Sequence, residues 1–181
     1  MRLIFLTLSI FILANKINAM NLLDKKKKSE TLHQEWEFVS DQVMGGVSSG
    51  ELNLITEEKE KFLRMSGTVS TANNGGFIQF RSNFNLNEED YKGIRIKVKG
   101  FPSDYYVHIR TNFLFLPWQY YSGKFVVTEE WNELEILFED FKKSNFYQPS
   151  NFLSSEIKSI GFVAFGKDFY AQLDMIEAEL F

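Results

Sequence analysis

Cysteine is absent from this chain of 181 residues, and histidine is scarce, with two residues in all. The missing thiols exclude disulfide bonds, thiolate metal ligands and a cysteine nucleophile. The two histidines, His33 and His108, lie far apart in the sequence, whereas metal sites built from side chains need clustered histidines and carboxylates. We therefore expect no metal or other cofactor, and a fold that is stabilised by its hydrophobic core.

An excess of basic residues is also lacking, because 24 acidic residues outnumber 20 basic ones. The resulting formal charge of −4 makes nucleic acid a poor partner, since binding to phosphates relies on clustered Lys and Arg. Hydrophobic residues make up 44% of the chain and include 19 Phe. This composition predicts a globular protein with a dense core.

Recognisable catalytic motifs are lacking as well. Gly45 and Gly46 are followed by no Lys-Ser or Lys-Thr pair, so they do not form a phosphate-binding loop. A Ser-His-Asp triad would have to use His108, but no nucleophile-elbow sequence is present. A glycosidase needs two carboxylates about 5 to 10 Å apart, a pair that sequence alone does not identify. We predict a protein that is not an enzyme.

The first 19 residues have the pattern of a cleaved signal peptide, with Arg2, an apolar run over residues 3–14, and Ala19 before the expected cleavage point. The run is shorter than the roughly 20 residues that span a bilayer, which disfavours the alternative of a retained membrane anchor. We predict export to the periplasm or the cell exterior. Residues 20–34, with lysines at 25–28, are predicted to form a flexible basic arm that is solvated or touches anionic lipid. Residues 35–181 are predicted to form one domain.

Beyond Trp36, apolar and polar residues alternate in several stretches, a pattern typical of strands with one buried face. Strands are predicted at 52–54, 63–69, 77–81, 94–99, 105–111, 118–127, 134–138, 160–165 and 171–180, the first two forming a hairpin and the last containing a bulge. No long helix is expected, and residues 140–156 are predicted to form a loop with at most one helical turn. The chain is therefore predicted to be all-β, an antiparallel β-sandwich or jelly roll of about nine strands.

Two glycine-rich segments, residues 41–48 and 70–77, interrupt the strands. Paired glycines permit a positive φ or a close backbone approach. Each segment therefore fits either a tight turn or a cradle for a ligand.

The first glycine-rich segment follows Trp36 in a set pattern, which is Trp, four residues, then Asp-x-Val-Met-Gly-Gly-x-Ser. Together with the pieces at 74–77, 93–100, 110–111, 118–121 and 160–162, this pattern resembles the family of complex I intermediate-associated protein 30 over nearly all of residues 35–181. The resemblance implies a jelly-roll sandwich similar to galactose-binding domains. For mitochondrial members it implies assembly of respiratory complex I, with membrane subunits of that complex as partners.

The strand at 105–111 places Tyr106, His108 and Arg110 on one face and apolar residues on the other. If the apolar face is core, the first set forms a polar and aromatic patch, which Gln79 and Arg81 could extend from another strand. Such mixtures suit sugars or peptide segments. The alternative is that Arg110 pairs with a buried acid such as Asp41 and that the aromatic residues belong to the core.

The residues predicted to contact a ligand or partner are Trp36, Asp41, Met44, Gly45, Gly46, Ser48, Asn74, Gly75, Gly76, His108, Arg110, Trp118, Gln119 and Tyr120. Three hypotheses remain open at this point. The first is an exported module that binds a glycan or a protein segment through the two glycine-rich loops, with Trp118 and Tyr120 nearby. The second is an assembly factor that acts through a broad protein-binding surface. The third is a hydrolase that acts on a sugar.

Overall fold

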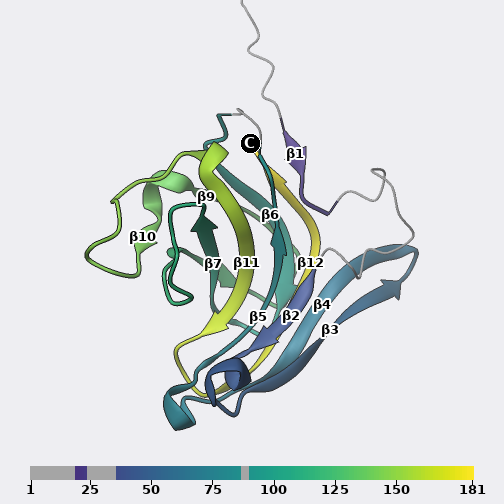
Figure 1. The fold of residues 1–181 in the computed structure, drawn as a ribbon. Helices are drawn as coiled ribbons and strands as arrows, with labels where there is room; N and C mark the ends of the chain where they lie inside the picture. The colour runs from purple at the N-terminus through teal and green to yellow at the C-terminus, as the bar shows by residue number, and fades with distance from the viewer. Residues whose placement is uncertain (1–18, 24–35, 87–89) are drawn as a thin grey trace, which may run out of the picture.

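The computed structural model describes residues 19–23, 36–86 and 90–181, which fold into two antiparallel sheets packed face to face (Figure 1). The β12 sheet has the order β3 (Ser49–Glu57), β4 (Glu60–Val69), β12 (Phe169–Leu180), β6 (Gly93–Gly100) and β9 (Asn132–Leu137), with β1 (Met20–Asn21) beside β12. The β11 sheet has the order β10 (Lys142–Lys143), β8 (Tyr121–Val127), β7 (Ser103–Thr111), β11 (Ile157–Phe165), β5 (Phe77–Asn83) and β2 (Glu37–Ser40). The predicted antiparallel β-sandwich is confirmed.

Helical structure within the described residues is limited to short 3-10 turns. They are η2 (Asp41–Met44), η3 (Ala72–Asn74), η4 (Phe138–Asp140) and η5 (Ser154–Glu156). None of the helical segments in this part of the chain has the length and apolar character needed to cross a membrane. No long helix was expected, and none is found in this part of the chain. The helical turn allowed for residues 140–156 corresponds to η5.

Alternating sequence produces alternating burial, as predicted. In β6, Ile94, Ile96 and Val98 are completely buried, while the basic residues between them are partly exposed. The β3–β4 hairpin forms with positive φ at Glu58 and Lys59, the backbone shape that suits a two-residue turn between twisted strands.

The bulge predicted in the last strand is confirmed. The pairing of β12 with β6 shifts register between Met175 and Glu177. The extra residue lets apolar side chains on both halves of β12 face the core, with Leu173 and Ala178 both buried.

One strand begins later than its sequence suggests. The stretch 118–127 was predicted to be continuous, but β8 begins at Tyr121, opposite Ile109. Tyr120 instead exchanges hydrogen bonds with Ser144, whose hydroxyl accepts from the Tyr120 amide and whose own amide donates to the Tyr120 carbonyl. Residues 118–120 therefore belong to a loop that precedes the strand.

Residues 20–22, which fall within the predicted basic arm, pair with the sandwich. Met20 and Asn21 pair with the end of β12, and the Leu22 amide donates to the Ala178 carbonyl at 2.7 Å (Figure 1). β4 pairs with β12 only as far as Met175, so β1 takes up backbone groups of β12 beyond that point. The lysines at 25–28, His33 and the predicted signal peptide up to residue 18 lie outside the described residues.

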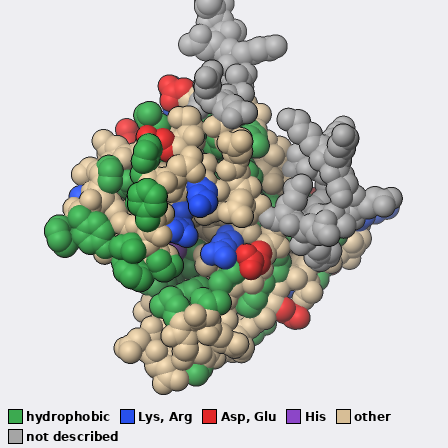
Figure 2. Space-filling model, viewed as in Figure 1, with side chains coloured by type: hydrophobic (Ala, Val, Ile, Leu, Met, Phe, Trp, Pro, Cys, Tyr) green, Lys and Arg blue, Asp and Glu red, His purple; other side chains and the backbone are tan. Residues whose placement is uncertain are grey.

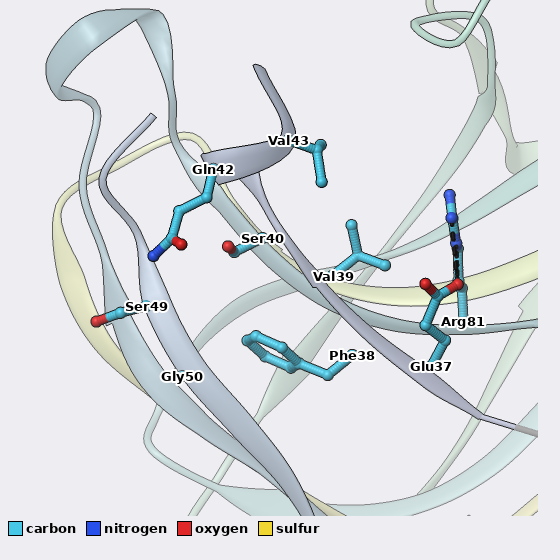
Figure 3. Close-up of a pocket in the computed structure, with 9 residues that line it drawn as sticks. All are labelled: Glu37, Phe38, Val39, Ser40, Gln42, Val43, Ser49, Gly50 and Arg81. Carbon is cyan, nitrogen blue, oxygen red and sulfur yellow. Dashed lines mark hydrogen bonds and ion pairs between the residues drawn. The ribbon is translucent and has the colours of Figure 1, made fainter. Parts of the chain in front are cut away.

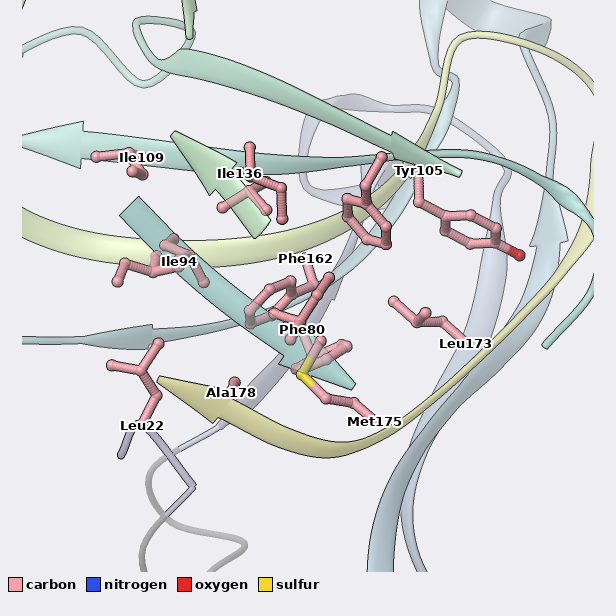
Figure 4. Close-up of a cluster of buried hydrophobic side chains, with 14 of the residues drawn as sticks. Leu22, Phe80, Ile94, Tyr105, Ile109, Ile136, Phe162, Leu173, Met175 and Ala178 are labelled. Atoms are coloured by element: carbon pink, nitrogen blue, oxygen red, sulfur yellow. The ribbon is translucent and has the colours of Figure 1, made fainter. Parts of the chain in front are cut away.

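The core fills the space between the sheets with aliphatic and aromatic side chains (Figure 4). Phe80 and Phe162 from the β11 sheet meet Met175 from the β12 sheet there, and all three are completely buried. Trp36 also belongs to this core, with its ring centroid 5.3 Å from that of Phe80 and 6.0 Å from that of Phe84, both in edge-on contact. The structure thus places Trp36 in the core and not on the surface, where a ligand-contacting residue would lie.

Candidate functional site

Asp41 joins the two glycine-rich segments from a completely buried position at the start of η2. Its carboxylate accepts hydrogen bonds from the Ser48 amide at 2.9 Å and from the Ser48 hydroxyl. It also accepts from the Gly76 amide and, at 3.3 Å, from the Phe77 amide. Burial alone would raise the pKa of Asp41, but the bonds from Ser48, Gly76 and Phe77 outweigh it and hold the pKa below its ordinary value.

The glycines around Asp41 are required by close contact and by backbone shape. A Cβ on Gly46 would stand 2.3 Å from the Asp41 Cγ, and one on Gly75 would stand 2.4 Å from its Oδ2. Gly45 has φ +90° and Gly76 has φ +129°, values that side-chain-bearing residues rarely adopt. These loops are turns closed around a buried carboxylate, since the donors of Ser48, Gly76 and Phe77 point at Asp41. Of the two interpretations of the segments, the structure supports the tight turn.

Other residues of the two glycine-rich segments face solvent. Met44 is 64% exposed and its neighbour Val43 is 73% exposed, both on η2. Asn74 is exposed and has φ 58°, in the left-handed region that asparagine tolerates. Met44 and Asn74 therefore remain available for contact, while Asp41, Gly46 and Gly75 lie inside the turns.

Arg110 does not pair with Asp41, the alternative that the sequence left open. Asp41 is occupied by Ser48 and the 76–77 amides, whereas the Arg110 Nη2 donates to the carbonyls of Leu114 and Leu116 at 3.1 Å each. No carboxylate among the described residues forms an ion pair with Arg110. Burial lowers the pKa of Arg110, and the positive charge of Arg81 lowers it further.

The outer face of the β11 sheet carries the polar and aromatic patch expected from residues 105–111. Tyr105, Val107 and Ile109 are completely buried in the core, and Tyr106, His108 and Arg110 therefore point outward. This is the face seen in Figure 2, where Lys and Arg side chains gather around a hollow and hydrophobic side chains line its margin.

Gly161 lies at the centre of this outer face. In register, His108 pairs with Gly161, Gly161 with Arg81, and Arg81 with Glu37, which forms one row across four strands. A Cβ on Gly161 would stand 3.0 Å from the Gln79 Oε1 and 3.3 Å from the Arg81 Cβ. The Gln79 amide and the Arg81 side chain take up the space that a side chain at Gly161 would fill. We call this part of the outer face, bordered by His108 on one side and by Gln79 and Arg81 on the other, the Gly161 hollow.

A ring stack covers His108. The Tyr120 ring lies parallel to the imidazole, with centroids 3.9 Å apart and planes 17° apart, and Phe165 approaches edge-on at 5.7 Å. The Nε2 atom of His108 has no accessible surface and no hydrogen-bond partner in the described structure. Burial lowers the pKa of His108 to about 3, so the ring is neutral at ordinary pH, and burial also raises the pKa of the Tyr120 hydroxyl.

The loop between β7 and β8 is held down at two points. Arg110 binds the carbonyls of Leu114 and Leu116, and the Gln119 Oε1 accepts from the Leu116 amide at 2.9 Å. Gln119 is buried, so it acts inside the loop, whereas Trp118 is 55% exposed. Among the residues predicted here, Trp118 and Tyr120 are available to a ligand and Gln119 positions the loop.

The candidate residues form two groups instead of one site. The glycine-rich loops adjoin the Phe77 and Phe165 end of the β11 sheet, and the Trp118 loop adjoins the end where Thr111 pairs with Ile157. Eight residue steps along β11 separate these ends, which is roughly 26 Å at about 3.3 Å per residue. Trp118 therefore lies at the far end of β11 from the glycine-rich loops. The Tyr120 ring, however, stacks on His108, which Phe165 contacts at 5.7 Å at the end that adjoins those loops.

A cleft of about 360 Å³ opens along the edge of the β11 sheet (Figure 3). Its lining residues are Glu37, Phe38, Val39, Ser40, Gln42, Val43, Ser49, Gly50 and Arg81. Glu37 and Arg81 form an ion pair across one end at 3.3 Å, so Arg81 belongs to the cleft and also to the Gly161 hollow.

Sequence reasoning missed Glu37 and Gly161. A glycine inside the predicted strand 160–165 is the signal that could have pointed to Gly161, because glycine in a strand often marks a close approach. No group of acids and histidines within the described residues has the arrangement needed to hold a metal ion.

The fold has counterparts among solved structures. A family 11 carbohydrate-binding module of a Clostridium thermocellum cellulase matches with a TM-score of 0.69 and 15% identity, covering 90% of this chain and 94% of that one. The same kind of module, described in complex with a β-1,3-1,4-mixed-linked tetrasaccharide, matches with a TM-score of 0.66 and 16% identity, with the same coverage. A family 30 carbohydrate-binding module from Clostridium thermocellum matches with a TM-score of 0.51 and 14% identity, covering 81% of this chain and 90% of that one. At these identities the likeness establishes the sandwich fold.

Sequence comparison identifies the family. No curated protein matches the chain by sequence. The family profile of complex I intermediate-associated protein 30, however, matches residues 24–174. That range contains the Trp36 to Ser48 pattern, both glycine-rich loops and nearly all strands of the sandwich. The chain therefore belongs to the complex I intermediate-associated protein 30 family.

Proposed function

We propose that this chain is a non-catalytic binding domain that recognises a glycan through the outer face of the β11 sheet. The observation that carries the proposal is the Gly161 hollow, where side chains with fixed polar groups stand beside aromatic rings. Gln79 and Arg81 border it from β5, and His108 with its stacked Tyr120 borders it from β7. Sugars bind to such mixtures because rings stack on aromatic faces while hydroxyls meet planar amide and guanidinium groups.

A non-catalytic role is supported by the acids on this face. Among the described strands of the β11 sheet, only Glu37 and Asp104 carry carboxylates on the outer side, and each pairs with a cation, Arg81 or Lys124. Glu37 lies in the same row as His108, three strands away, and Asp104 lies four residues before His108 on β7. At ordinary strand and residue spacing, the Cα atoms of Glu37 and Asp104 are therefore roughly 20 Å apart. Glycoside hydrolysis needs two carboxyl groups within about 10 Å.

The proposal is tested by a glycan-array screen followed by calorimetric titration of the glycan that binds. Gln79→Ala should weaken binding about fivefold, the effect of one lost hydrogen bond of about 1 kcal/mol. Gln172→Ala, which changes the same residue type on β12 of the other sheet, should bind like the parent. A parent protein that binds no glycan, or two variants that weaken binding equally, would contradict the proposal.

Export is part of the same proposal. The pattern of residues 1–19 favours cleavage after Ala19, which would leave Met20 as the first residue, and Met20 is where β1 begins. N-terminal sequencing of the protein recovered outside the producing cell should therefore read Met-Asn-Leu-Leu. Recovery of the intact chain inside the cell would contradict export.

A second function, binding of a membrane subunit of respiratory complex I, is favoured by a separate surface. Two neighbouring loops, joined by hydrogen bonds from Ser144 to Trp118 and Tyr120, expose large apolar side chains. These are Phe113, Phe115, Leu116, Trp118, Phe146, Tyr147 and Leu153, which we call the aromatic patch. Phe115 is 85% exposed and Phe146 is 87% exposed. Exposed apolar side chains gathered in one patch are typical of an interaction surface.

The test of this second function is co-purification with respiratory complex I subunits from solubilised membranes. Replacing Phe115 and Phe146 together by Ser should abolish capture of those subunits. The control replaces Phe101 and Tyr170 by Ser, two exposed aromatic residues outside the aromatic patch. Capture that survives the first pair of changes would eliminate the aromatic patch as the partner site, and glycan binding by that variant should be unaffected.

A further inference from the structure

We propose that the Gly161 hollow binds a carboxylate, so that the glycan recognised by this domain is an acidic one containing uronate sugars. The inference rests on the proposed glycan-binding function and adds the chemical class of the ligand. It is carried by two guanidinium groups that lie on this face of an acidic protein and are poorly compensated by the chain's own acids.

Arg81 and Arg110 flank the hollow from opposite sides. Arg81 on β5 pairs with Gly161 of β11, and Arg110 on β7 pairs with Ser159 of β11. The two β11 partners are two residues apart. Ordinary sheet spacing puts the Cα atoms of the two arginines roughly 12 Å apart. The two charges interact, because Arg81 contributes to the lowered pKa of Arg110.

Neither guanidinium has a strong carboxylate partner in the described part of the chain. Arg110 is partly buried and donates only to the carbonyls of Leu114 and Leu116, and its Nε is buried with no hydrogen-bond partner. Arg81 meets only Glu37, through long contacts of 3.3 and 3.4 Å to one oxygen. A partly buried cation without an anion carries a desolvation cost that a bound carboxylate would offset.

A carboxylate is the anion that fits this arrangement. The guanidinium group presents paired donors that match the two oxygens of a carboxylate, and such bonds are stronger than those between neutral groups. Two arginines suffice for one carboxylate, whereas a nucleic acid needs an extended basic surface. His108 is neutral and covered by Tyr120, so it adds a stacked surface and no charge. The amide of Gln79 stands over Gly161 and is placed to meet a sugar hydroxyl.

Glu37 is the chain's own competitor for the site. Its side chain is 67% exposed and reaches Arg81 only at 3.3 Å, so a ligand carboxylate has access to the same guanidinium. Removing the Glu37 charge should therefore strengthen binding of an acidic ligand, while removing the Arg81 charge should weaken it. A purely structural ion pair would not produce these opposite effects on affinity.

The experiment is calorimetric titration of the full chain with tetragalacturonate and with its methyl-esterified form, which has the same size and no charge. Alginate tetrasaccharides serve as a second acidic probe and cellotetraose as a neutral one. The acid form of at least one uronate should bind at least about tenfold more tightly than the neutral probes, as charge-assisted hydrogen bonds exceed neutral ones. Arg81→Gln should remove that preference, and Glu37→Gln should tighten acid binding about threefold by removing a competing carboxylate.

Lys124→Gln is the matched control, because it removes one positive charge from the same face away from the hollow. Lys124 lies on β8 and pairs with Asp104 at 2.8 Å. The inference is overturned if Lys124→Gln and Arg81→Gln weaken binding equally, or if Glu37→Gln weakens it.

Three further outcomes separate this inference from the proposed function. Binding of cellotetraose without preference for a uronate would overturn the acidic ligand and leave the glycan-binding function standing. Binding of a hexaglutamate peptide in preference to the acidic sugars would show that the carboxylate comes from a protein partner, and would overturn the uronate. Binding of none of these probes or of any glycan on the array would overturn both.

Discussion

At the residue scale, Asp41 explains most of the motif from Trp36 to Ser48 and of the glycine-rich loop before Phe77. One buried carboxylate gathers donors from Ser48, Gly76 and Phe77, which lie up to 36 residues away in sequence. Gly46 and Gly75 leave room for it. The fixed spacing between Trp36 and Ser48 therefore reflects the folding of two turns around one side chain, with Trp36 anchored separately in the core.

Replacing Asp41 by Asn should lower the free energy of unfolding by about 3 kcal/mol, because an amide would turn donors toward donors in a buried site. Urea unfolding measures this loss. Asp104→Asn, which changes a partly exposed carboxylate paired with Lys124, should lose about 1 kcal/mol or less. Equal midpoints for the parent and Asp41→Asn would show that the carboxylate is not required.

The same side chain should make stability depend on pH. The pKa of Asp41 in the folded chain lies below the ordinary value of 3.8. The contribution of Asp41 to the free energy of unfolding is therefore complete above the unfolded-state pKa, and it is lost as the pH falls through the folded-state pKa. Unfolding free energy measured from neutral pH down to pH about 2 should fall for the parent and fall less steeply for Asp41→Asn.

Gly46 and Gly45 are adjacent but should respond differently to alanine. A Cβ at Gly46 would stand 2.3 Å from the Asp41 carboxyl, so Gly46→Ala should cost more than about 3 kcal/mol or prevent folding. Gly45 has φ +90° and open space around it, so Gly45→Ala should cost about 1 kcal/mol of backbone strain. Melting temperatures in the reverse order would contradict the role assigned to the Asp41 contact.

At the scale of secondary structure elements, the strands follow from local alternation, while their ends depend on partners. β6 and the β3–β4 hairpin appear where the sequence predicts them, because a period of two buries one face wherever a core is available. β8 starts at Tyr121 because Ser144 takes the hydrogen bonds of Tyr120. β1 forms because β12 extends past its pairing with β4.

The docking of β1 predicts that the first residues after Ala19 stabilise the domain. Leu22 is 4% exposed and its amide binds the Ala178 carbonyl. Leu22→Ala should therefore lower the free energy of unfolding by about 3 kcal/mol, as for other buried leucines. Asn21→Ala, at an exposed neighbouring position, should cost about 1 kcal/mol or less. A neutral Leu22→Ala would indicate that β1 contributes nothing to stability in solution.

At the scale of the whole molecule, two sheets share one core, and each keeps an outer face. The β11 sheet presents the Gly161 hollow, the cleft beside Glu37 and, at one end, the aromatic patch. The Asp41 turns lie at the other end. The Asp41 turn also borders the cleft, through Gln42 and Val43. The Gly161 hollow and the aromatic patch, the surfaces that we propose for binding, lie outside the turns.

The division between core and surface predicts opposite behaviour for two tryptophans. Trp36 is 4% exposed and packs on Phe80 and Phe84, so Trp36→Ala should lower the free energy of unfolding by about 4 kcal/mol. Trp118 is 55% exposed, so Trp118→Ala should leave the melting temperature nearly unchanged. Similar losses for both variants would contradict the placement of Trp118 on the surface.

The sequence by itself determined the sandwich class, the faces of the strands and the bulge in β12. It also placed Tyr106, His108 and Arg110 on one face. These features depend on the alternation of side chains along a strand, which is local. The family followed from the spacing of residues 36–48, which is local too.

Only the tertiary structure decided which residues of different strands meet. The row from His108 through Gly161 to Arg81 depends on register, and a shift of one residue would send these side chains to the other face. The partners of Asp41, the burial of Trp36 and the distance between the two groups of candidate residues depend likewise on long-range pairing. Such contacts are set by the packing of the whole core, because no local pattern encodes a neighbour that lies tens of residues away.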